Sequence, residues 1–217
     1  MWRGQSRACH GWGMSPTSKA ALREQLLAAR RRVADDVRAT EARLLCEQLA
    51  ALQNFVSSDS TVCAYVPVGG EPGSVDMVDV LLQRFRRVLL PVARTDVDGA
   101  ALPLHWGEYR PGELIAGRWG LLEPPEPWLP ALALAEAGLV LVPALAVDRG
   151  GVRLGRGRGF YDRSLVARDP HARLVAVVRD PELVPALPAE SHDIPMTHAL
   201  TPRGGLMALN ASMTHRE

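Results

Sequence analysis

The residues best suited to chemistry in this sequence are gathered in one glycine-rich segment, Gly150–Arg163. Cationic and small residues follow one another along it, in the order Arg153, Leu154, Gly155, Arg156, Gly157, Arg158 and Gly159. Glycine tolerates positive φ angles and lets a backbone approach a ligand closely, and arginine guanidinium groups suit phosphate oxygens. Asp162 adds a hard oxygen ligand of the kind that Mg²⁺ prefers. Together these parts predict a site for a metal-bound polyphosphate.

The elements on either side of this segment would orient it. An apolar run over Leu139–Pro143 precedes it and predicts a buried strand, and Ser164–Ala167 is typical of a helix start. A strand, a glycine loop and a helix in that order direct unpaired backbone N–H groups and the positive end of a helix at the loop. We therefore expect the loop to hold an anion.

Neither of two known phosphate-binding patterns fits the segment completely. The pattern G-x-x-x-x-G-K-[ST] begins correctly at Gly150, but Arg156 stands at the lysine position and Gly157 at the hydroxyl position. The dinucleotide pattern G-x-G-x-x-G does not fit, because the glycines alternate. A flexible surface turn with solvated arginines and an RNA-contacting arginine–glycine segment remain as alternatives. The RNA alternative is weakened because the segment occurs once and follows a buried strand.

Composition and charge bound the class of protein. The chain has 217 residues, 47% of them hydrophobic and 23% charged, which is typical of a globular protein with a substantial core. A formal net charge of +1 gives no global field that would recruit nucleic acid or an acidic membrane. Cys9, Cys46 and Cys63 show no C-x-x-C spacing, and reduced thiols suit a reducing cytosol. No apolar run reaches membrane-spanning length, so we expect a cytoplasmic protein without nucleic-acid or membrane partners.

Hydrophobic periodicity predicts strands that alternate with helices. Ser18 can cap a helix from Lys19, whose apolar residues recur at three and four positions as far as Val37. Further helices are expected over residues 40–55 and 77–86, and strands over residues 61–66, 88–92, 102–106, 139–142 and 174–178. This alternation predicts an α/β fold, a Rossmann-like three-layer α/β/α sandwich around a mainly parallel, mixed sheet.

The predicted domain occupies most of the chain. We expect residues 17–205 to form a single α/β catalytic domain. Residues 1–16 include arginines and no acidic residue, but they lack the apolar segment of a signal peptide. We expect them to be a disordered extension, or an over-extended start in which Met14 is the true initiator. Residues 206–217 are expected to be a frayed tail.

Charged residues outside the glycine-rich segment are candidates by position. Glu71 lies in the loop that follows the strand at 61–66, and ligands of open α/β sheets bind at the carboxyl ends of strands. It is either a site carboxylate or a plain turn residue. Lys19 and Arg23 lie one turn apart and project from the same side of the first helix, where a solvated helix face is the alternative.

Several separated pieces of the sequence match one family in order and spacing. The most specific piece is the block from Arg153 to Asp162. The others are Lys19…Arg23, Tyr65-x-Pro67…Glu71, Gly120-Leu121-Leu122-Glu123-Pro124 and Glu190…His192-Asp193-Ile194-Pro195. With these pieces the chain resembles the 5-formyltetrahydrofolate cyclo-ligases, also called methenyltetrahydrofolate synthetases, from about Lys19 to Thr201.

The resemblance implies an enzyme that uses ATP and Mg²⁺ to convert 5-formyltetrahydrofolate to 5,10-methenyltetrahydrofolate, with release of ADP and phosphate. ATP would be held by Lys19, Arg23, Arg153, Leu154, Gly155, Arg156, Gly157, Arg158, Gly159, Phe160 and Tyr161. The folate would be held by Glu71, Arg156, Gly157, Arg158, Gly159 and Phe160. Asp162 and Asp193 would serve the Mg²⁺. Lys19, Arg156 and Arg158 would neutralise charge during catalysis.

The implied chemistry suits these residue types. A formamide oxygen is a poor leaving group, so closure of the ring by N10 requires that this oxygen first be phosphorylated. Phosphoryl transfer needs positioning and neutralised charge more than a protein nucleophile, and the chain offers no credible nucleophile–base pair. The alternative is a related protein that binds nucleotide but has lost or changed the folate reaction. In either case we expect a monomer.

Three tryptophans and one histidine are left with open roles. Trp106, Trp119 and Trp128 could stack on a pterin, and for each the alternative is packing in the core or anchoring of a loop. His192 stands next to Asp193 in a proline-flanked loop, where it is a ligand, a base or a residue that orders the loop. The sequence does not decide between these roles.

Overall fold

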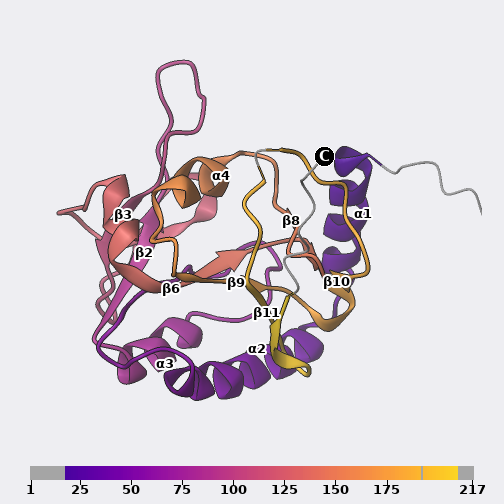
Figure 1. Ribbon diagram of the computed structural model, residues 1–217, viewed down its shortest axis with the longest axis horizontal. Helices are drawn as coiled ribbons and strands as arrows, with labels where there is room; N and C mark the ends of the chain where they lie inside the picture. The colour runs from indigo at the N-terminus through magenta and orange to yellow at the C-terminus, as the bar shows by residue number, and fades with distance from the viewer. Residues whose placement is uncertain (1–17, 192, 210–217) are drawn as a thin grey trace, which may run out of the picture.

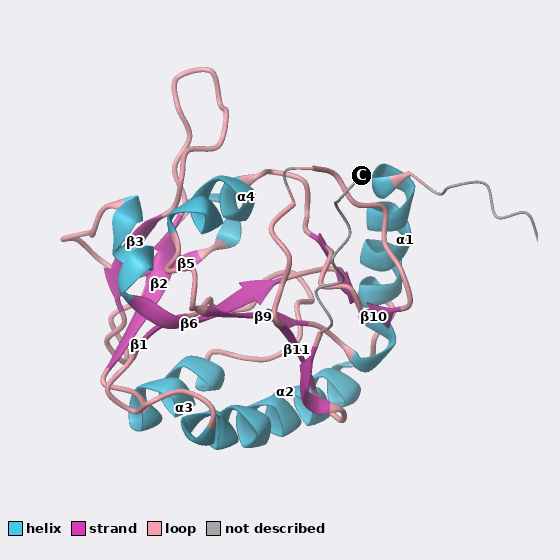
Figure 2. Ribbon diagram, viewed as in Figure 1, coloured by secondary structure: helices cyan, strands magenta, loops and turns pink. Residues whose placement is uncertain are grey.

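A central sheet of seven strands organises the part of the chain that the computed structural model describes, residues 18–191 and 193–209. From one edge to the other its strands are β12 (Gly205–Ala208), β11 (His198–Thr201), β9 (Arg173–Val177), β6 (Ala137–Pro143), β1 (Thr61–Cys63), β2 (Arg87–Val92) and β3 (His105–Glu108). The five inner strands run parallel, and the two edge strands pair antiparallel with their neighbours. Helices lie above and below the sheet (Figure 1, Figure 2).

The two faces of the sheet are both buried. One face is covered by α2 (Asp35–Ala50), η1 (Ala51–Asn54) and α3 (Asp76–Arg84), and the other by η3 (Ala131–Glu136), α4 (Phe160–Ser164) and η4 (Leu165–Ala167). Side chains of a strand alternate between faces, so Leu139 and Leu141 of β6 pack on the first side while Val140 and Val142 pack on the second. The predicted three-layer α/β/α fold around a mainly parallel, mixed sheet is confirmed.

A small second sheet carries the glycine-rich segment. Its strands are β10 (Leu183–Val184), β7 (Ala146–Asp148) and β8 (Arg153–Leu154), in that order. The Asp148 carboxylate accepts hydrogen bonds from the backbone N–H groups of Val152 and Leu187, both at 2.9 Å, and so closes the turn between β7 and β8. The glycine loop therefore does not follow β6 directly, as the sequence suggested, but is presented by this hairpin.

The first helix is shorter than predicted. Helix α1 (Lys19–Arg31) ends before Val33, and α2 starts a separate helix at Asp35. The Arg38 guanidinium donates to the backbone carbonyls of Arg30 and Val33, which lie at and just beyond the end of α1. Acidic residues in the first turn of α2 favour a helix start there, because the amino end of a helix is positive. The expected apolar face extending to Val37 is wrong for this reason, and Val37 is 42% exposed.

Other predicted limits need correction near the functional region and at the end of the chain. Helix α4 begins at Phe160, directly after Gly159, and not at Ser164. The weak strand expected over 102–106 lies instead at His105–Glu108. The chain is not frayed directly after Gly205, because residues 205–208 form β12 and pair with β11. The domain therefore extends to at least Ala208.

Within the described ranges, no helix is long and apolar enough to cross a membrane. Cys46 and Cys63 are free thiols, and Cys63 is buried. Cys9, Met14 and His192 lie outside the described residues, as do the predicted extension at 1–16 and most of the predicted tail. Those expectations stay predictions.

Candidate active site

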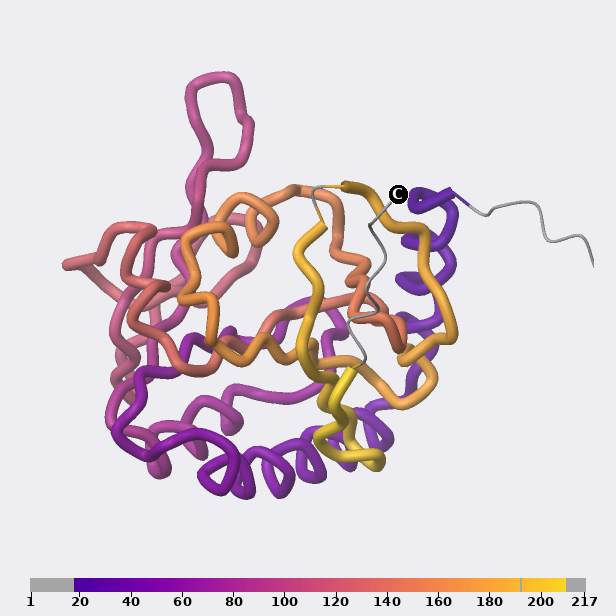
Figure 3. Tube along the Cα trace, viewed as in Figure 1, coloured from indigo at the N-terminus to yellow at the C-terminus, as the bar shows by residue number. Residues whose placement is uncertain are grey.

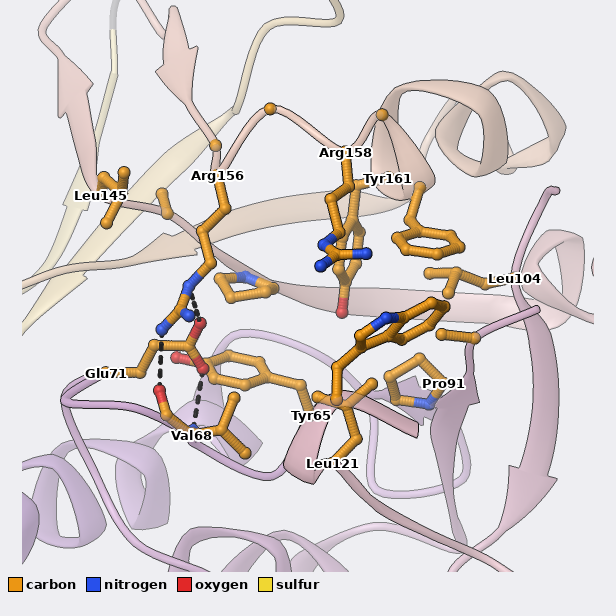
Figure 4. Close-up of a pocket in the computed structure, with 18 of the residues that line it drawn as sticks. Tyr65, Val68, Glu71, Pro91, Leu104, Leu121, Leu145, Arg156, Arg158 and Tyr161 are labelled. Carbon is orange, nitrogen blue, oxygen red and sulfur yellow. Dashed lines mark hydrogen bonds and ion pairs between the residues drawn. The ribbon is translucent and has the colours of Figure 1, made fainter. Parts of the chain in front are cut away.

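A cavity of about 290 Å³ opens at the carboxyl ends of three central strands. Tyr65 follows β1, Pro91 lies near the end of β2 and Pro143 ends β6, and all three line the cavity. The glycine-rich segment, from Gly155 to Asp162, lines the opposite side (Figure 4). Ligands of open α/β sheets bind at this place, as the sequence analysis expected.

Glu71 and Arg156 join the two sides of the cavity (Figure 4). Arg156 Nε lies 3.1 Å from Glu71 Oε1, and Arg156 Nη2 donates to the carbonyl oxygen of Val68 at 2.9 Å. The backbone N–H of Val68 donates to Glu71 Oε2 at 3.0 Å, so the carboxylate also closes its own turn. Glu71 is therefore both of the things that the sequence left open: a turn residue and a carboxylate at the cavity.

The surroundings of Glu71 disfavour its ionised form, because the carboxylate is buried. Its side chain is 8% exposed. Burial raises the pKa of the Glu71 carboxyl, while the Val68 N–H and the guanidinium groups of Arg156 and Arg30 act against the rise. A ligand N–H that donates to this carboxylate would replace hydration that burial has removed. The site thus favours a ligand with hydrogen-bond donors at this end.

Arg158 lies against an aromatic ring. Its Cζ atom is 4.7 Å from the centroid of the Trp119 ring, and the ring centroids of Trp119 and Phe160 are 5.6 Å apart. Trp119 belongs to η2 (Arg118–Gly120), which connects β4 (Ile115–Ala116) and β5 (Leu122–Glu123). This short hairpin brings an indole to the cavity.

The structure separates the three tryptophans considered for stacking. Trp106 is 1% exposed and belongs to the core. Trp128 packs under Arg94, whose Cζ is 4.1 Å from its ring, and its indole N–H donates to the carbonyl oxygen of Pro124. Trp128 does not line the cavity, whereas Trp119 does and is 41% exposed.

Arg153 and Asp162 form an ion pair at the cavity wall. The Arg153 side chain is 8% exposed and the Asp162 side chain 36%, so the carboxylate retains access to solvent. Leu154, between Arg153 and the first loop glycine, is 1% exposed and outside the cavity lining. Its side chain packs in the interior, so only its backbone is placed to meet a ligand.

The other side of the glycine-rich segment faces α1. Figure 3 shows the indigo trace of α1 beside segments from the last third of the chain. Arg23 Nε donates to the carbonyl oxygen of Gly155 at 2.9 Å. Lys19 Nζ lies 2.9 Å from Asp193 Oδ2 and 3.2 Å from Glu190 Oε2. Lys19, Arg23 and Asp193 do not line the cavity, so the predicted residues fall on two sides of the loop.

The two predicted Mg²⁺ ligands are not brought together as a closed metal site. Among residues 18–191 and 193–209, no three His, Cys, Asp or Glu side chains gather as metal ligands. Mg²⁺ carried on a nucleotide needs only one or two carboxylates, because phosphate oxygens and water fill its other positions. The partly exposed carboxylate of Asp162 fits that role, whereas Asp193 is paired with Lys19.

Two buried residues to which the sequence analysis gave no role also line the cavity. Arg30 is 2% exposed and Tyr65 is 3% exposed. Arg30 Nη1 and the hydroxyl groups of Tyr65 and Tyr161 have no hydrogen-bond partner within the described chain. Buried polar atoms are nearly always paired, so these three atoms are candidates for hydrogen bonds to a ligand in the cavity. Arg30 lies two helical turns after Arg23, so the sequence places both on the same side of the first helix. This spacing was the signal that could have identified Arg30 as a candidate.

Comparisons with known sequences point to one family. The model of the 5-formyltetrahydrofolate cyclo-ligase family matches residues 15–202. A 5-formyltetrahydrofolate cyclo-ligase of Mycolicibacterium smegmatis is 57% identical over 196 residues, which cover 90% of this chain and 100% of that relative. The enzyme of the same name from Escherichia coli K12 is 33% identical over 144 residues, covering 65% of this chain and 78% of the relative.

Solved structures support the same fold. An NMR structure of 5,10-methenyltetrahydrofolate synthetase from Aquifex aeolicus superposes with a TM-score of 0.72 at 24% identity, covering 92% of this chain and 96% of that one. A synthetase of the same name from Mycoplasma pneumoniae gives a TM-score of 0.65 at 18% identity, covering 83% and 96%. The family match over residues 15–202 and the 57% identical relative show that the chain is an enzyme of the 5-formyltetrahydrofolate cyclo-ligase family.

Proposed function

We propose that this enzyme converts 5-formyltetrahydrofolate and ATP to 5,10-methenyltetrahydrofolate, ADP and phosphate. The observation that carries the proposal is the pairing, across one cavity, of a buried carboxylate with an arginine of the glycine-rich segment, Glu71 with Arg156. A folate head group needs a carboxylate that accepts from its N–H groups, and a nucleotide needs cations. The two requirements meet at this contact.

The cavity is suited to the folate. Leu104, Leu121 and Pro91 give it an apolar wall, and Glu71 lies toward the other side (Figure 4). A pterin is flat, carries donors and acceptors along one edge, and fits a pocket whose polar groups converge at one end. The unpartnered Tyr65 hydroxyl lies at that end and adds a polar group to it.

The nucleotide is assigned to the loop and to α1. Arg23 already contacts the loop backbone at Gly155, and Lys19 projects from the same helix one turn earlier. Gly157 and Gly159 have φ angles of 88° and 77°, which free backbone positions for close approach to phosphate. Asp162 would hold the Mg²⁺ that accompanies the triphosphate and neutralises part of its charge; Asp193, the second predicted ligand, would first have to leave Lys19.

The reaction follows from this placement. The formyl oxygen attacks the γ-phosphorus, the bond to the β–γ bridging oxygen breaks, and ADP leaves. N10 then attacks the formyl carbon, loses its proton, and the carbon–oxygen bond breaks with release of phosphate. Arg156 and Arg158 line the cavity on the glycine-rich segment, where their charge would stabilise the phosphoryl group in transfer. Lys19 would add a third cation after exchanging its carboxylate partners for phosphate.

The test is spectroscopic. Purified protein mixed with Mg-ATP and 5-formyltetrahydrofolate should produce the methenyl chromophore, with one ADP formed for each methenyl group. Reactions that omit ATP, Mg²⁺ or protein are the controls. A folded protein that binds ATP but yields no chromophore would contradict the proposal and support the alternative of a related protein with a lost or changed folate reaction.

The cellular setting is part of the proposal. Free thiols at Cys46 and Cys63 suit a reducing compartment, and we assign the enzyme to the cytoplasm as a monomer acting on small molecules. Size-exclusion chromatography with light scattering checks the monomer: a mass near 23.6 kDa is expected, and a dimer would contradict it.

A further inference from the structure

We infer that Trp119 is a substrate-binding residue whose indole stacks on the p-aminobenzoyl ring of the folate, the aromatic ring attached to N10. The inference rests on the proposed function. It gives a binding role to a residue that lies outside the motifs of the sequence. Three features of Trp119 support it: its backbone conformation, its surroundings and its position relative to Glu71.

The backbone of Trp119 is in a conformation that suits glycine. Its φ and ψ angles are 57° and 26°, and it is the only residue other than glycine with positive φ in the described part of the chain. A bulky aromatic residue is unfavourable there, and such outliers persist where the surrounding structure holds them, most often at ligand sites. The turn is held by the Gly117 N–H, which donates to the Leu121 carbonyl oxygen at 2.8 Å.

The strained backbone presents the indole to the cavity. Trp119 is 41% exposed although it lines the cavity, so one part of the ring is free to contact a ligand. The guanidinium groups of Arg118 and Arg158 lie 5.0 Å and 4.7 Å from its centroid and fix its orientation. Phe160, at 53° to the indole, adds a second aromatic surface.

The position of Trp119 selects the part of the folate that it meets. Glu71, the proposed partner of the pterin, lies beside Val68 and Arg156 at one side of the cavity (Figure 4). Arg158 stands apart from that pair, toward Leu104 and Leu121 (Figure 4). Trp119 lies against Arg158, whose Cζ atom is 4.7 Å from the centroid of its ring. A pterin seated at Glu71 places its N10 substituent toward this second side. The adenine of ATP is assigned elsewhere, because Lys19 and Arg23 lie across the loop.

The test compares two ligands on one variant. Trp119→Leu should raise the Kd of 5-formyltetrahydrofolate, measured by isothermal titration calorimetry, by about tenfold, since removal of an aromatic platform typically has an effect of this size. The Kd of 5-formyl-6-methyltetrahydropterin, which lacks the aminobenzoyl ring, should stay within about twofold, and so should that of Mg-ATP. Trp119→Phe keeps an aromatic face and should restore most of the folate affinity.

Two further variants separate binding from folding. Trp119→Gly removes the strained backbone as well as the indole, so the melting temperature should rise or stay unchanged while folate affinity falls as in Trp119→Leu. Trp128→Leu is the matched control, because Trp128 also packs under an arginine but does not line the cavity. Its folate Kd should be unchanged.

Several results would overturn the inference. A folate Kd unchanged in Trp119→Leu would do so, and so would equal weakening of the pterin analogue, which would place the pterin on the indole. Weakened ATP binding in Trp119→Leu would assign the ring to adenine. Turnover by the wild-type protein decides the proposed function separately. A wild-type enzyme that forms the chromophore, together with an unaffected Trp119→Leu, would leave that function standing and remove only this inference.

Discussion

At the scale of single residues, the contact between Glu71 and Arg156 carries most of the proposed chemistry. It joins residues far apart in the sequence and closes at 3.1 Å between Arg156 Nε and Glu71 Oε1. Arg156 also donates to Val68, so the arginine couples the glycine-rich segment to the Glu71 turn. A substrate that contacts this pair would therefore touch residues from both sides of the cavity.

Glu71→Gln tests the folate assignment. The amide keeps the shape of the side chain but loses the charge that accepts hydrogen bonds from the pterin. A hydrogen bond to a charged group is worth about 1.5–3 kcal/mol, so the folate KM should rise by roughly ten- to hundredfold. The ATP KM should change by less than about threefold. Equal effects on both substrates in steady-state kinetics would refute this role.

The raised pKa of Glu71 predicts opposite pH trends for binding and stability. Burial raises the pKa, so the carboxylate is protonated at a pH above the usual glutamate range of about 4.3. As pH falls through that raised pKa, the folate KM should rise because the acceptor charge is lost.

Low pH weakens folate binding, but it favours the contribution of Glu71 to the free energy of unfolding. A folded pKa above the unfolded value makes the contribution favourable at low pH, and it is lost as pH rises through the folded pKa. Kinetics and thermal unfolding across this range, with Glu71→Gln as reference, check both trends. A folate KM with the same pH profile in wild type and variant would contradict the assignment.

At the scale of elements, the glycine-rich segment is fixed between the β7–β8 hairpin, α4 and α1. Gly151 has a φ of 93°, and a Cβ atom there would lie 2.6 Å from the carbonyl oxygen of Met196. Gly157 has a φ of 88°, and a Cβ atom would lie 3.3 Å from the Arg23 guanidinium. The loop glycines are thus required by backbone geometry on both sides of the segment.

Gly157→Ala should weaken nucleotide binding, and the effect should be larger than its backbone penalty alone would cause. The added methyl group forces Arg23 to shift, and displacement of a positioning group by a fraction of an ångström to about 1 Å can cost tenfold or more in catalysis. We expect the ATP KM to rise by about tenfold. Gly112→Ala is the control, because its φ of 79° gives the same backbone penalty with no atom within 4 Å of the new Cβ. Matching ATP KM values in the two variants would contradict this account.

Buried contacts of Arg30 connect α1 to Glu182 and to the end of β6 beside the cavity. Arg30 Nε lies 2.7 Å from Glu182 Oε1, and Arg30 Nη2 donates to the carbonyl oxygen of Ala144 at 2.6 Å. Glu182, the last residue of η5 (Asp180–Glu182), also accepts from the backbone N–H of Arg179 at 2.8 Å. The pair holds α1 in position, and with it Lys19 and Arg23.

Glu182→Gln should be strongly destabilising. It leaves the Arg30 charge buried without its counter-ion, which typically costs about 3–5 kcal/mol of unfolding free energy. Glu47→Gln removes the partner of Arg43 in an exposed pair on α2 and should cost less than about 1 kcal/mol. Denaturant unfolding of both variants measures the difference. Similar losses in the two would show that burial of the Arg30 pair adds nothing.

At the scale of the whole molecule, the carboxyl-terminal strand belongs to the domain. Residues Gly205–Ala208 pair with β11 at the edge of the sheet, and Leu206 packs against the core cluster that includes Leu200. Without β12, the β11 edge would expose unpaired backbone groups. We therefore expect β12 to stabilise the domain, although none of its residues lines the cavity.

Two truncations test this contribution. A chain that ends at Gly204 should melt about 5 °C below a chain that ends at Leu209, because the loss of a paired strand and of apolar contacts is worth about 1–2 kcal/mol. Comparison of the two removes any effect of residues 210–217. Equal melting temperatures by calorimetry would return the domain boundary to Gly205, where the sequence had placed it.

The layers of the fold, and the phosphate-binding character proposed for the glycine-rich segment, follow from local sequence patterns. Alternation of apolar strands and amphipathic helices is local, and therefore it gave the three-layer fold with a mainly parallel sheet. The glycine–arginine block and the ordered motif pieces led to the family that the comparisons confirm. The limits of helices and strands did not follow from local patterns: the turn between α1 and α2, the start of α4 and the presence of β12 depend on caps and pairings with other segments.

Which residues meet depends on how distant segments pack together. The pairing of Arg156 with Glu71 and the burial of Arg30 against Glu182 depend on contacts between residues distant in sequence. The distinction of Trp119 from Trp106 and Trp128 depends on which of the three lines the cavity. Periodicity reports which face of an element is apolar, but it carries no information about which segment packs against that face. The cavity is lined by residues at or just beyond the ends of β1, β2 and β6 and by the glycine-rich segment, so it becomes visible only once the sheet has brought these parts together.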